Sequence, residues 1–501
     1  MQLDPDICYR ALVARDARFD GRFFVAVSTT RIYCRPICPA RTPHPDHVTF
    51  YPTAAAAEDA GYRPCLRCRP ETAPDIGAWR GTSNTVSRAM ALIETGALDD
   101  GDVEGLAARL GLGGRQLRRL FEAHLGASPL RVAQTRRVHL AKQLIHDTDL
   151  SMTEVAMAAG FGSVRRFNDT FRRLYRRPPG ALRHRGSAAA DSAIRLTLAY
   201  KPPYDWEAII AFLAARAIPG VETVEAGCYR RTFANGAVEV RHEPQRHRLA
   251  VAIRCDEIGI LPATIARLRR VFDLVADPEA IAAHLGRDPV LAPLLARRPG
   301  LRLPGAWDGF EMAVRAIIGQ QITVAGACNL LGKLVAVYGV PVAGGEDGLT
   351  HRFPTSDRLV GAEIASLGMP GARGRAIANL ARAAIADPAL LDRAASLDES
   401  IAALRVVPGI GDWTAHYIAL RALREPDAFP ASDVGLLRAM ATDGVRPTPR
   451  DLLARAEAWR PWRGYAAQHL WAGDAAAALT EAPKIHAKAP SEEQPDREAV
   501  A

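Results

Sequence analysis

The chain has 501 residues, which at about 150 residues per domain predicts three or four domains and excludes a single small module. Hydrophobic residues make up 48%, enough for packed cores, and no run of about 18 uncharged apolar residues predicts a membrane span. The net charge of +9 falls within residues 101–186, where 16 Lys and Arg face 7 Asp and Glu, so this segment is expected to attract a polyanion.

Along the chain, the patterns predict three blocks and a tail. Residues 1–75 mix short extended runs, at 23–27 and 47–50, with turns, and residues 82–185 have helical periodicity. The sequence GSAAADS then predicts a flexible linker. Residues 194–281 carry β-like runs at 194–198, 237–241 and 249–253 around a helical stretch at 206–216, and residues 310–478 are predicted mostly helical. After Lys484 the composition is polar and predicts disorder.

The chain starts with MQLDPDICYR, which lacks the basic residues followed by an apolar stretch that a secretory signal would have. This predicts a cytoplasmic protein.

Four of the eight cysteines form two close pairs, Cys34-x3-Cys38 and Cys65-x2-Cys68. Such pairs let four sulfur atoms converge on one tetrahedral Zn²⁺, and in a reducing compartment metal is favoured over disulfides. A purely structural zinc site would explain this spacing, but zinc-bound sulfur is also held as a nucleophilic thiolate. Arginines that would suit phosphate surround the pairs: Arg31, Arg35, Arg41, Arg63, Arg67 and Arg69. The scattered cysteines are predicted to be small buried hydrophobic residues: Cys8, Cys228, Cys255 and Cys328.

Residues from about 10 to 71 resemble the N-terminal domain of the Ada family, through FFVAVSTTRIYCRPICPAR and AGYRPCLRCRP. The resemblance implies that this domain takes a methyl group from DNA methylphosphotriesters. It implies that Cys34 is the methyl acceptor and that Cys38, Cys65 and Cys68 complete a site for one Zn²⁺. A thiolate that attacks a methyl carbon in line needs no general base, and turnover would stop after one transfer.

Two helix-turn-helix units are predicted in the basic segment, one from helices at 102–110 and 115–125 and one from helices at 151–159 and 163–174. Joined by a long helix, they resemble the AraC-type DNA-binding domain, with AGF and the spacing of Phe167 and Phe171 typical of its second half. A helical hairpin with a solvated arginine face is the alternative. Side chains placed to meet bases and phosphates are Arg115, Gln116, Arg118, Arg119, Ser163, Arg165, Arg166 and Asn168.

The sequence LRVVPGIG followed by DWTAHYIALRAL predicts a helix, a tight hairpin and a second helix starting near Asp412. The backbone N–H groups of Gly409 and Gly411 would point at a DNA phosphate at the positive end of that helix, although P-G-x-G also matches ordinary turns. Asp433 follows in PDAFPASDVGLLRA, a distance that resembles the helix-hairpin-helix DNA glycosylases. RPGLRLPGAWDGFEMAVRAIIGQQIT and RPWRGYAAQHLW further resemble the 3-methyladenine DNA glycosylase II family, AlkA.

This second resemblance implies roles for individual residues. Asp433 would stabilise an oxocarbenium-like transition state and orient or deprotonate the water that attacks C1′ of a flipped nucleotide. Trp413, Tyr417 and Trp471 match the family's aromatic pocket, whose faces favour a cationic base, although each could also be a core residue. The family's apolar wedge falls at Gln321, which departs from the pattern.

Absent motifs narrow the expected activity. Glycosylase–lyases of this superfamily carry Lys at the position of Trp413, so no Schiff base is expected and base removal should be monofunctional. The cysteine cluster of the iron–sulfur members is missing, since Cys328 is the last cysteine, and so no iron–sulfur cluster is expected. The PCHR-type site of O6-alkylguanine methyltransferases is also missing.

The predicted fold class is multidomain and mainly α with α+β parts. The expected segments are an Ada-like zinc domain (1–78), an AraC-like double helix-turn-helix (79–185), a linker (186–193), an AlkA N-terminal-like α+β subdomain (194–300), an all-α helix-hairpin-helix glycosylase domain (301–480) and a disordered tail (481–501). The expected function is removal of 3-methyladenine and 7-methylguanine from double-stranded DNA, together with activation of transcription at an operator, where by resemblance RNA polymerase is a partner. The alternative is a regulator whose glycosylase half is a non-catalytic scaffold.

Overall fold

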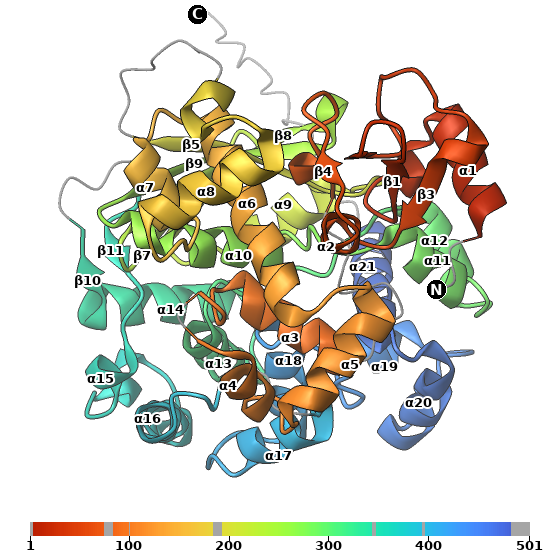
Figure 1. Ribbon diagram of the computed structural model, residues 1–501. Helices are drawn as coiled ribbons and strands as arrows, with labels where there is room; N and C mark the ends of the chain where they lie inside the picture. The colour runs from red at the N-terminus through yellow and green to blue at the C-terminus, as the bar shows by residue number, and fades with distance from the viewer. Residues whose placement is uncertain are drawn as a thin grey trace, which may run out of the picture.

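The computed structural model describes residues 4–74, 84–99, 101–183, 193–342, 347–392 and 396–481. The predicted tail beyond its first residue, most of the predicted linker and the first predicted domain boundary lie outside these residues. Figure 1 shows four consecutive blocks in chain order, and the fold class expected from the sequence is confirmed. Within the described residues, no helix is long and apolar enough to cross a membrane.

The first block is a small α+β unit built on a four-stranded sheet of order β3-β1-β2-β4. Its elements are α1 (Pro5–Ala14), β1 (Phe24–Val27), β2 (Ile32–Cys34), β3 (Val48–Tyr51), α2 (Ala54–Asp59) and β4 (Arg63–Pro64). β1 is antiparallel to both β2 and β3, whereas β2 and β4 run parallel. The carboxyl ends of β2 and β4 therefore lie at the same edge of the sheet, and the cysteine pairs follow there.

The second block is all-helical, and its helices are α3 (Asn84–Glu94), α4 (Val103–Ala108), α5 (Gly114–Leu125), α6 (Pro129–Asp147), α7 (Met152–Ala158) and α8 (Val164–Tyr175). Local signals fix the boundaries: Ser128 caps α6, Ser151 forms a capping box with Glu154, and Gly126 ends α5 with φ +68°. The pairs α4–α5 and α7–α8 are the two expected helix-turn-helix units, and α6 joins them.

The third block is a five-stranded antiparallel sheet of order β5-β9-β8-β7-β6. Its elements are β5 (Ile194–Ala199), α9 (Trp206–Ala214), β6 (Glu222–Glu225), β7 (Cys228–Phe233), β8 (Gly236–Glu243), β9 (Arg248–Cys255) and α10 (Leu261–Val271). The sequence did not predict β6 and β7, because β7 breaks the apolar alternation with a buried Arg231. This guanidinium is neutralised by Glu222 and Glu311, at 3.2 and 2.8 Å.

The fourth block is mainly helical, as expected, with a two-stranded β10–β11 pair inserted. Its elements are α11 (Pro278–Leu285), α12 (Leu291–Arg297), α13 (Gly309–Ile318), α14 (Val324–Tyr338), β10 (Val340–Pro341), β11 (His351–Arg352), α15 (Ser356–Leu359), α16 (Gly371–Ala386), α17 (Leu397–Arg405), α18 (Asp412–Arg421), α19 (Val434–Ala439), α20 (Pro449–Ala456) and α21 (Arg463–Glu481). Its core includes Ile281 and Leu291, so α11 and α12 pack with this block although they precede residue 300.

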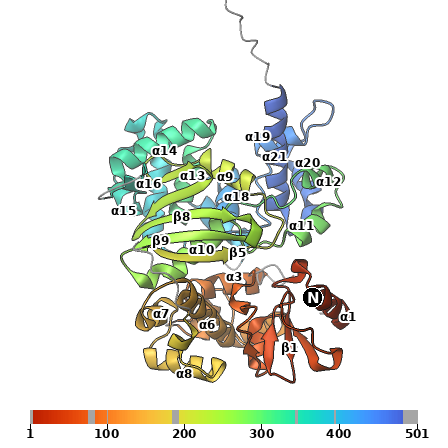
Figure 2. The same cartoon turned by 90° about the horizontal axis from the view of Figure 1, so that it is seen from above.

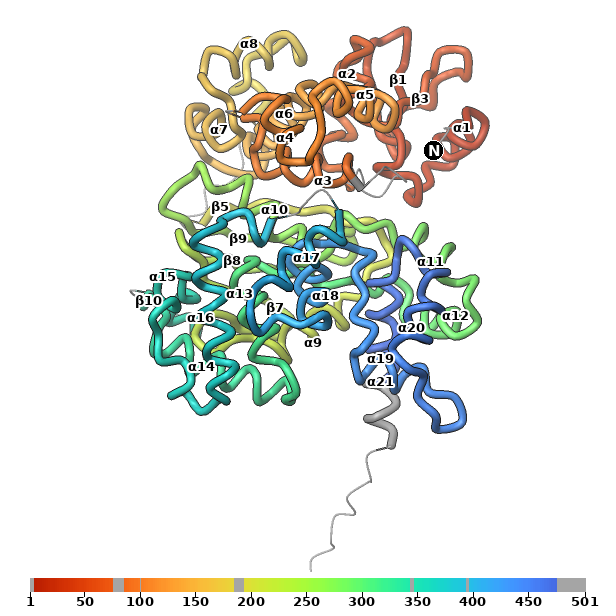
Figure 3. The backbone as a smooth tube through the Cα atoms, turned by 90° about the horizontal axis from the view of Figure 1, so that it is seen from below, coloured from red at the N-terminus to blue at the C-terminus, as the bar shows by residue number. Residues whose placement is uncertain are grey.

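The N-terminal two blocks pack directly on the C-terminal two (Figures 2 and 3), where α3 contacts α10 and α6 contacts β5. One hydrophobic core continues from α6, α7 and α8 into the five-stranded sheet. Across the same junction, Arg88 of α3 forms a buried ion pair with Glu425, which follows α18, at 2.9 Å. Arg22 of the first block contacts Asp277 at 2.9 Å. The two halves of the chain therefore share a packed and charged interface.

Candidate metal centre, DNA-binding helices and glycosylase cleft

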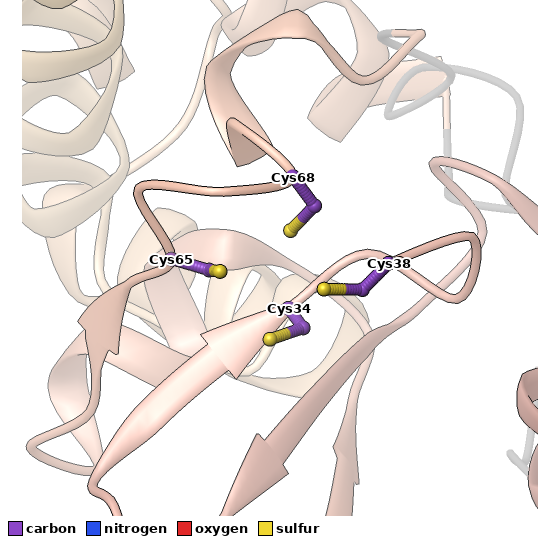
Figure 4. A group of neighbouring side chains, drawn as sticks. All are labelled: Cys34, Cys38, Cys65 and Cys68. Atoms are coloured by element: carbon purple, nitrogen blue, oxygen red, sulfur yellow. The ribbon is translucent and has the colours of Figure 1, made fainter. Parts of the chain in front are cut away.

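The four clustered cysteines meet at the sheet edge, as the spacing predicted (Figure 4). Cys34 ends β2 and Cys65 follows β4, and the loops beyond them bring in Cys38 and Cys68. The four Sγ atoms lie within 4.8 Å of one another. A tetrahedral zinc site with Zn–S bonds of about 2.3 Å requires S···S distances of about 3.8 Å, so this all-sulfur donor set fits Zn²⁺.

The surroundings of this centre stabilise negatively charged sulfur. The backbone N–H groups of Arg35 and Arg67 donate to the Sγ atoms of Cys68 and Cys65, both at 3.4 Å. Cys34 is half-buried, whereas the other three cysteines are buried. Of the four residues, Cys34 is therefore the one with the most surface exposed to solvent.

The expected arginine collar is smaller than the sequence suggested. Arg35 is tied inward, because its guanidinium donates to Asp20 at 2.8 Å and to Thr72 at 2.7 Å. Arg69 donates to the buried Glu71 at 3.0 Å. These two arginines were wrongly included, since each neutralises an internal carboxylate. The exposed members are Arg31, Arg41, Arg63 and Arg67.

The first predicted recognition helix, α5, presents most of its predicted side chains to solvent. Arg115, Gln116 and Arg119 are exposed on it. Arg118 is also exposed but pairs with Glu104 of α4 at 2.7 Å. The charge available to DNA on this helix is therefore less than its arginine count implies.

The second predicted recognition helix, α8, has exposed Arg165 and Arg166, with Asn168 half-buried. Ser163 is the N-cap of this helix, and its hydroxyl accepts from the backbone N–H of Arg166 at 3.2 Å. Ser163 thus has a structural task that the sequence analysis did not assign, because a cap and a DNA contact have the same residue preference.

In the C-terminal half, a cleft of about 1670 Å³ gathers the residues predicted for base excision. Asp433 is half-buried there and caps α19, with Oδ1 accepting from the N–H of Leu436 at 3.1 Å. The indole N–H of Trp413 donates to Oδ2 at 2.8 Å, and that of Trp471 donates to Oδ1 at 2.9 Å. The carboxylate is thus held in a fixed orientation by a helix end and two tryptophans.

The aromatic residues form one wall of this cleft. Trp413 and Tyr417, one turn apart on α18, have ring centroids 5.2 Å apart and an interplanar angle of 7°. Trp471 of α21 meets Tyr417 edge-on at 6.2 Å. All three are half-buried and line the cleft, and Tyr417 and Trp471 also pack against the core of this block.

The hairpin between α17 and α18 lines the same cleft. Gly409 adopts φ +100°, and a Cβ there would lie 2.3 Å from that of Ala376, so this turn needs glycine. Gly411 caps α18, and nothing within 4 Å would meet a Cβ there. Because Gly411 has no side chain, no side chain at this position covers the first backbone N–H groups of α18.

Gln321 lies exposed in the α13–α14 loop, in the left-handed region with φ +57°. Its neighbour Gln320 joins this loop to the hairpin, because its amide donates to the carbonyl of Gly409 at 3.3 Å and to Thr414 at 2.9 Å. These hydrogen bonds link the loop that carries the predicted wedge to the predicted phosphate-binding hairpin.

The sequence analysis missed the cleft residues Arg421 and Gln468. Arg421 follows Tyr417 by one turn, and this spacing was a usable signal, but a lone arginine on a helix normally indicates a solvent-facing side chain. Two of the scattered cysteines, Cys8 and Cys228, are buried as expected. Cys255 and Cys328 are only half-buried.

Comparison with known proteins agrees with this architecture. Three family models match the chain: the metal binding domain of Ada over residues 7–71, a helix-turn-helix domain over 106–185 and the AlkA N-terminal domain over 195–308. A "probable bifunctional transcriptional activator/DNA repair enzyme AlkA" of Mycobacterium tuberculosis is 44% identical over 482 residues, which cover 94% of this chain and 97% of that protein.

Other relatives match one half each. The DNA-3-methyladenine glycosylase 2 of Escherichia coli is 37% identical over 55% of this chain and 96% of its own length. The bifunctional transcriptional activator/DNA repair enzyme Ada of E. coli is 35% identical over 32% of this chain and 43% of its own length. The structure of a 3-methyladenine DNA glycosylase from Archaeoglobus fulgidus shares the fold, with a TM-score of 0.50 at 24% identity over 56% of this chain and 99% of that one. With 44% identity across nearly its whole length, the chain belongs to the family of bifunctional transcriptional activator/DNA repair enzymes AlkA.

Proposed function

We propose that the C-terminal half is a monofunctional DNA glycosylase that removes alkylated purines, including 3-methyladenine and 7-methylguanine, from double-stranded DNA. The observation that carries this proposal is the half-buried Asp433 carboxylate, fixed by Trp413 and Trp471 in the aromatic cleft beside the Gly409–Gly411 hairpin. The hairpin would bind the DNA backbone through α18, and Gln321 would occupy the space left by the flipped nucleotide.

The proposed chemistry requires little acid catalysis, because an N-alkylated purine already carries positive charge and leaves as a neutral base. What the step requires is an anion beside the sugar, which Asp433 supplies, together with an oriented water. Trp413 stands where a lyase would need lysine, and an indole cannot form a Schiff base. Release of an intact abasic site is therefore expected.

The N-terminal half would act as a methyl acceptor and sensor. When bound, zinc keeps the four sulfurs as thiolates. The Sγ of Cys34, the only one of the four residues that is not buried, would attack the methyl carbon of a methylphosphotriester. A new S–C bond forms, the C–O bond breaks with its electron pair going to the phosphate oxygen, and the transfer occurs once. The exposed cations available to the phosphate are Arg31, Arg41, Arg63 and Arg67.

A route from this centre to the DNA-binding helices supports the sensor role. Next to Cys34, Tyr33 donates to Glu58 at 2.9 Å, and Glu58 accepts from Thr135 of α6 at 2.7 Å. Close to Cys68, the fully buried Glu71 pairs with Lys142 of α6 at 2.8 Å. Since α6 joins both helix-turn-helix units, the centre contacts the element that sets their relative position.

Incubation of the purified protein with methylated duplex DNA tests the first proposal by the release of free 3-methyladenine or 7-methylguanine. Release without strand nicking and without a borohydride-trapped adduct supports a monofunctional enzyme. Operator binding without any base release would instead support the alternative, a regulator whose glycosylase half is a scaffold. That alternative has less support, because a scaffold needs no carboxylate held by two indole N–H groups.

A further inference from the structure

The cleft wall formed by α18 is charged differently at its two ends. Trp413, Tyr417 and Arg421 follow one another at four-residue intervals and so share one face of the helix. At the first end, Trp413 bonds to the Asp433 carboxylate. Toward the other end is Arg421, whose Cα lies about 12 Å farther along the axis than that of Trp413, at 1.5 Å per residue. A carboxylate and a cation thus bracket the aromatic wall.

Arg421 is an unusual cation because it donates to neutral acceptors, while Arg216 and Arg424, which act on it electrostatically, carry the same charge. It is 3% exposed, and its guanidinium donates to the Pro304 carbonyl and to Oε1 of Gln468, both at 3.0 Å. Its Cζ lies 5.5 Å from the ring centroid of Tyr417 and 5.3 Å from that of Trp471. Arg424, less than one turn farther on, pairs instead with Asp273.

Burying a cation against neutral acceptors is unfavourable, so its retention in the wall of a cleft points to a task. The field of this cation reaches the wall. Burial raises the pKa of the Tyr417 hydroxyl, but the pKa is lowered overall because the Arg421 and Arg216 charges and a hydrogen bond from Arg421 together outweigh burial.

The reaction itself moves positive charge along this wall. The bond from the base nitrogen to C1′ breaks with its electron pair going to the base, so a cationic purine becomes neutral while the sugar becomes cationic. Water then adds at C1′ and loses a proton to the Asp433 carboxylate. Charge therefore leaves the aromatic pocket beside Arg421 and develops beside Asp433.

We propose that Arg421 is an electrostatic positioning residue that repels the positive charge of a bound alkylated base and so drives charge toward the sugar. This inference rests on the proposed glycosylase function. Aromatic rings alone would favour binding of the cationic base. With Arg421 beside them, the pocket is expected to bind this cationic ground state less tightly than the rings alone would. The penalty is removed as the base becomes neutral, and interactions stronger in the transition state than in the ground state raise the rate.

The decisive variant is Gln468→Glu. It keeps the size of the side chain and the contact with Arg421 Nη2, but it places a carboxylate on the guanidinium and cancels its field. Single-turnover release of 7-methylguanine from a methylated duplex is expected to fall about tenfold, the effect of about 1.4 kcal/mol. Affinity for the methylated duplex, relative to the unmodified duplex, should rise. The matched control is Gln245→Glu, which adds the same charge on an exposed turn outside the cleft.

Arg421→Gln and Arg421→Lys complete the test, with melting temperatures confirming that each variant folds. Arg421→Gln should repeat the split between slower release and tighter binding, and Arg421→Lys, which keeps the charge, should stay closer to the wild-type rate. Unchanged release by both Gln468→Glu and Arg421→Gln would overturn the inference, as would slower release caused entirely by weaker binding. Absence of release by the wild-type protein would instead refute the proposed glycosylase function.

Discussion

The exchange of Asp433 for Asn tests the centre of the proposed mechanism. At an effective dielectric constant of about 20, a unit charge about 4 Å from a developing sugar cation contributes about 4 kcal/mol. The dipole of the Asn amide recovers part of this transition-state stabilisation. A net loss of about 2.7 kcal/mol already corresponds to a rate about a hundredfold lower. Base release by Asp433→Asn should therefore fall by at least about a hundredfold.

The structure also predicts what this substitution leaves intact. Asn is as good an N-cap as Asp, so α19 should keep its first turn. The Asn oxygen can keep the bonds from Leu436 and Trp471, but the amide N–H₂ then faces the Trp413 indole N–H, so one hydrogen bond of about 1 kcal/mol is lost. The melting temperature and DNA affinity should hardly change.

The assay is single-turnover release of 7-methylguanine, with DNA affinity measured separately by fluorescence anisotropy. Asp357→Asn, on the exposed face of α15, removes the same charge outside the cleft and is the matched control. Asp433→Asn protein that releases base within tenfold of the wild-type rate would refute the assigned role, and so would a loss fully explained by weaker DNA binding.

Four further outcomes are expected. Elemental analysis should give about one zinc per chain, and Cys65→Ala should unfold the first block locally, because metal binding and folding are coupled. Methylation of Cys34 lowers the formal charge of a Zn(Cys)4 centre from 2− to 1− beside DNA-facing arginines, so operator affinity at fixed salt should rise about tenfold. Arg88→Met leaves the Glu425 charge buried and unpaired, and should lower the free energy of unfolding by about 3 to 5 kcal/mol in denaturant titrations. Burial lowers the pKa of His469 to about 4. As pH falls from about 6.5 toward 4, the unfolded chain therefore binds a proton that the folded chain does not, and the free energy of unfolding decreases. In His469→Gln this decrease should be smaller.

Each of these expectations has a contradicting result. A fully folded protein without metal would exclude the zinc prediction. Equal operator affinities before and after methylation would leave the N-terminal domain without a sensor role, and a Cys34→Ser protein that still switches would indicate another acceptor. An Arg88→Met variant as stable as wild type would show that the junction is not energetically coupled. A pH dependence of stability that survives in His469→Gln would assign the effect to other groups.

The sequence by itself determined the local features of this protein. Cysteine spacing placed the four sulfurs, because a parallel strand pair brings the two loops to one edge whatever the rest of the chain does. Caps and turn glycines fixed the helix-turn-helix units to within a residue or two, since these signals act over one turn. The motif around Asp433 placed the carboxylate in the cleft with Trp413 and Trp471.

Tertiary structure decided the features that depend on pairing between distant segments. Strand β7 was not predicted, because Arg231 looks incompatible with a core until Glu222 and Glu311 are placed beside it. Arg35 looked like a phosphate ligand until Asp20 neutralised it. The sequence alone does not show whether a charged side chain is buried or exposed, because its burial is favourable only when a partner far along the chain supplies the opposite charge.

The same reason explains why the junction and Arg421 were found only in the structure. The pairing of Arg88 with Glu425 spans 337 positions, and no periodicity encodes a contact at that separation. The role proposed for Arg421 depends on its surroundings, which are neutral hydrogen-bond acceptors, the Tyr417 and Trp471 rings and the cleft. Spacing places a residue on a face of its helix, whereas only packing decides whether that face meets water, a carboxylate or an aromatic wall.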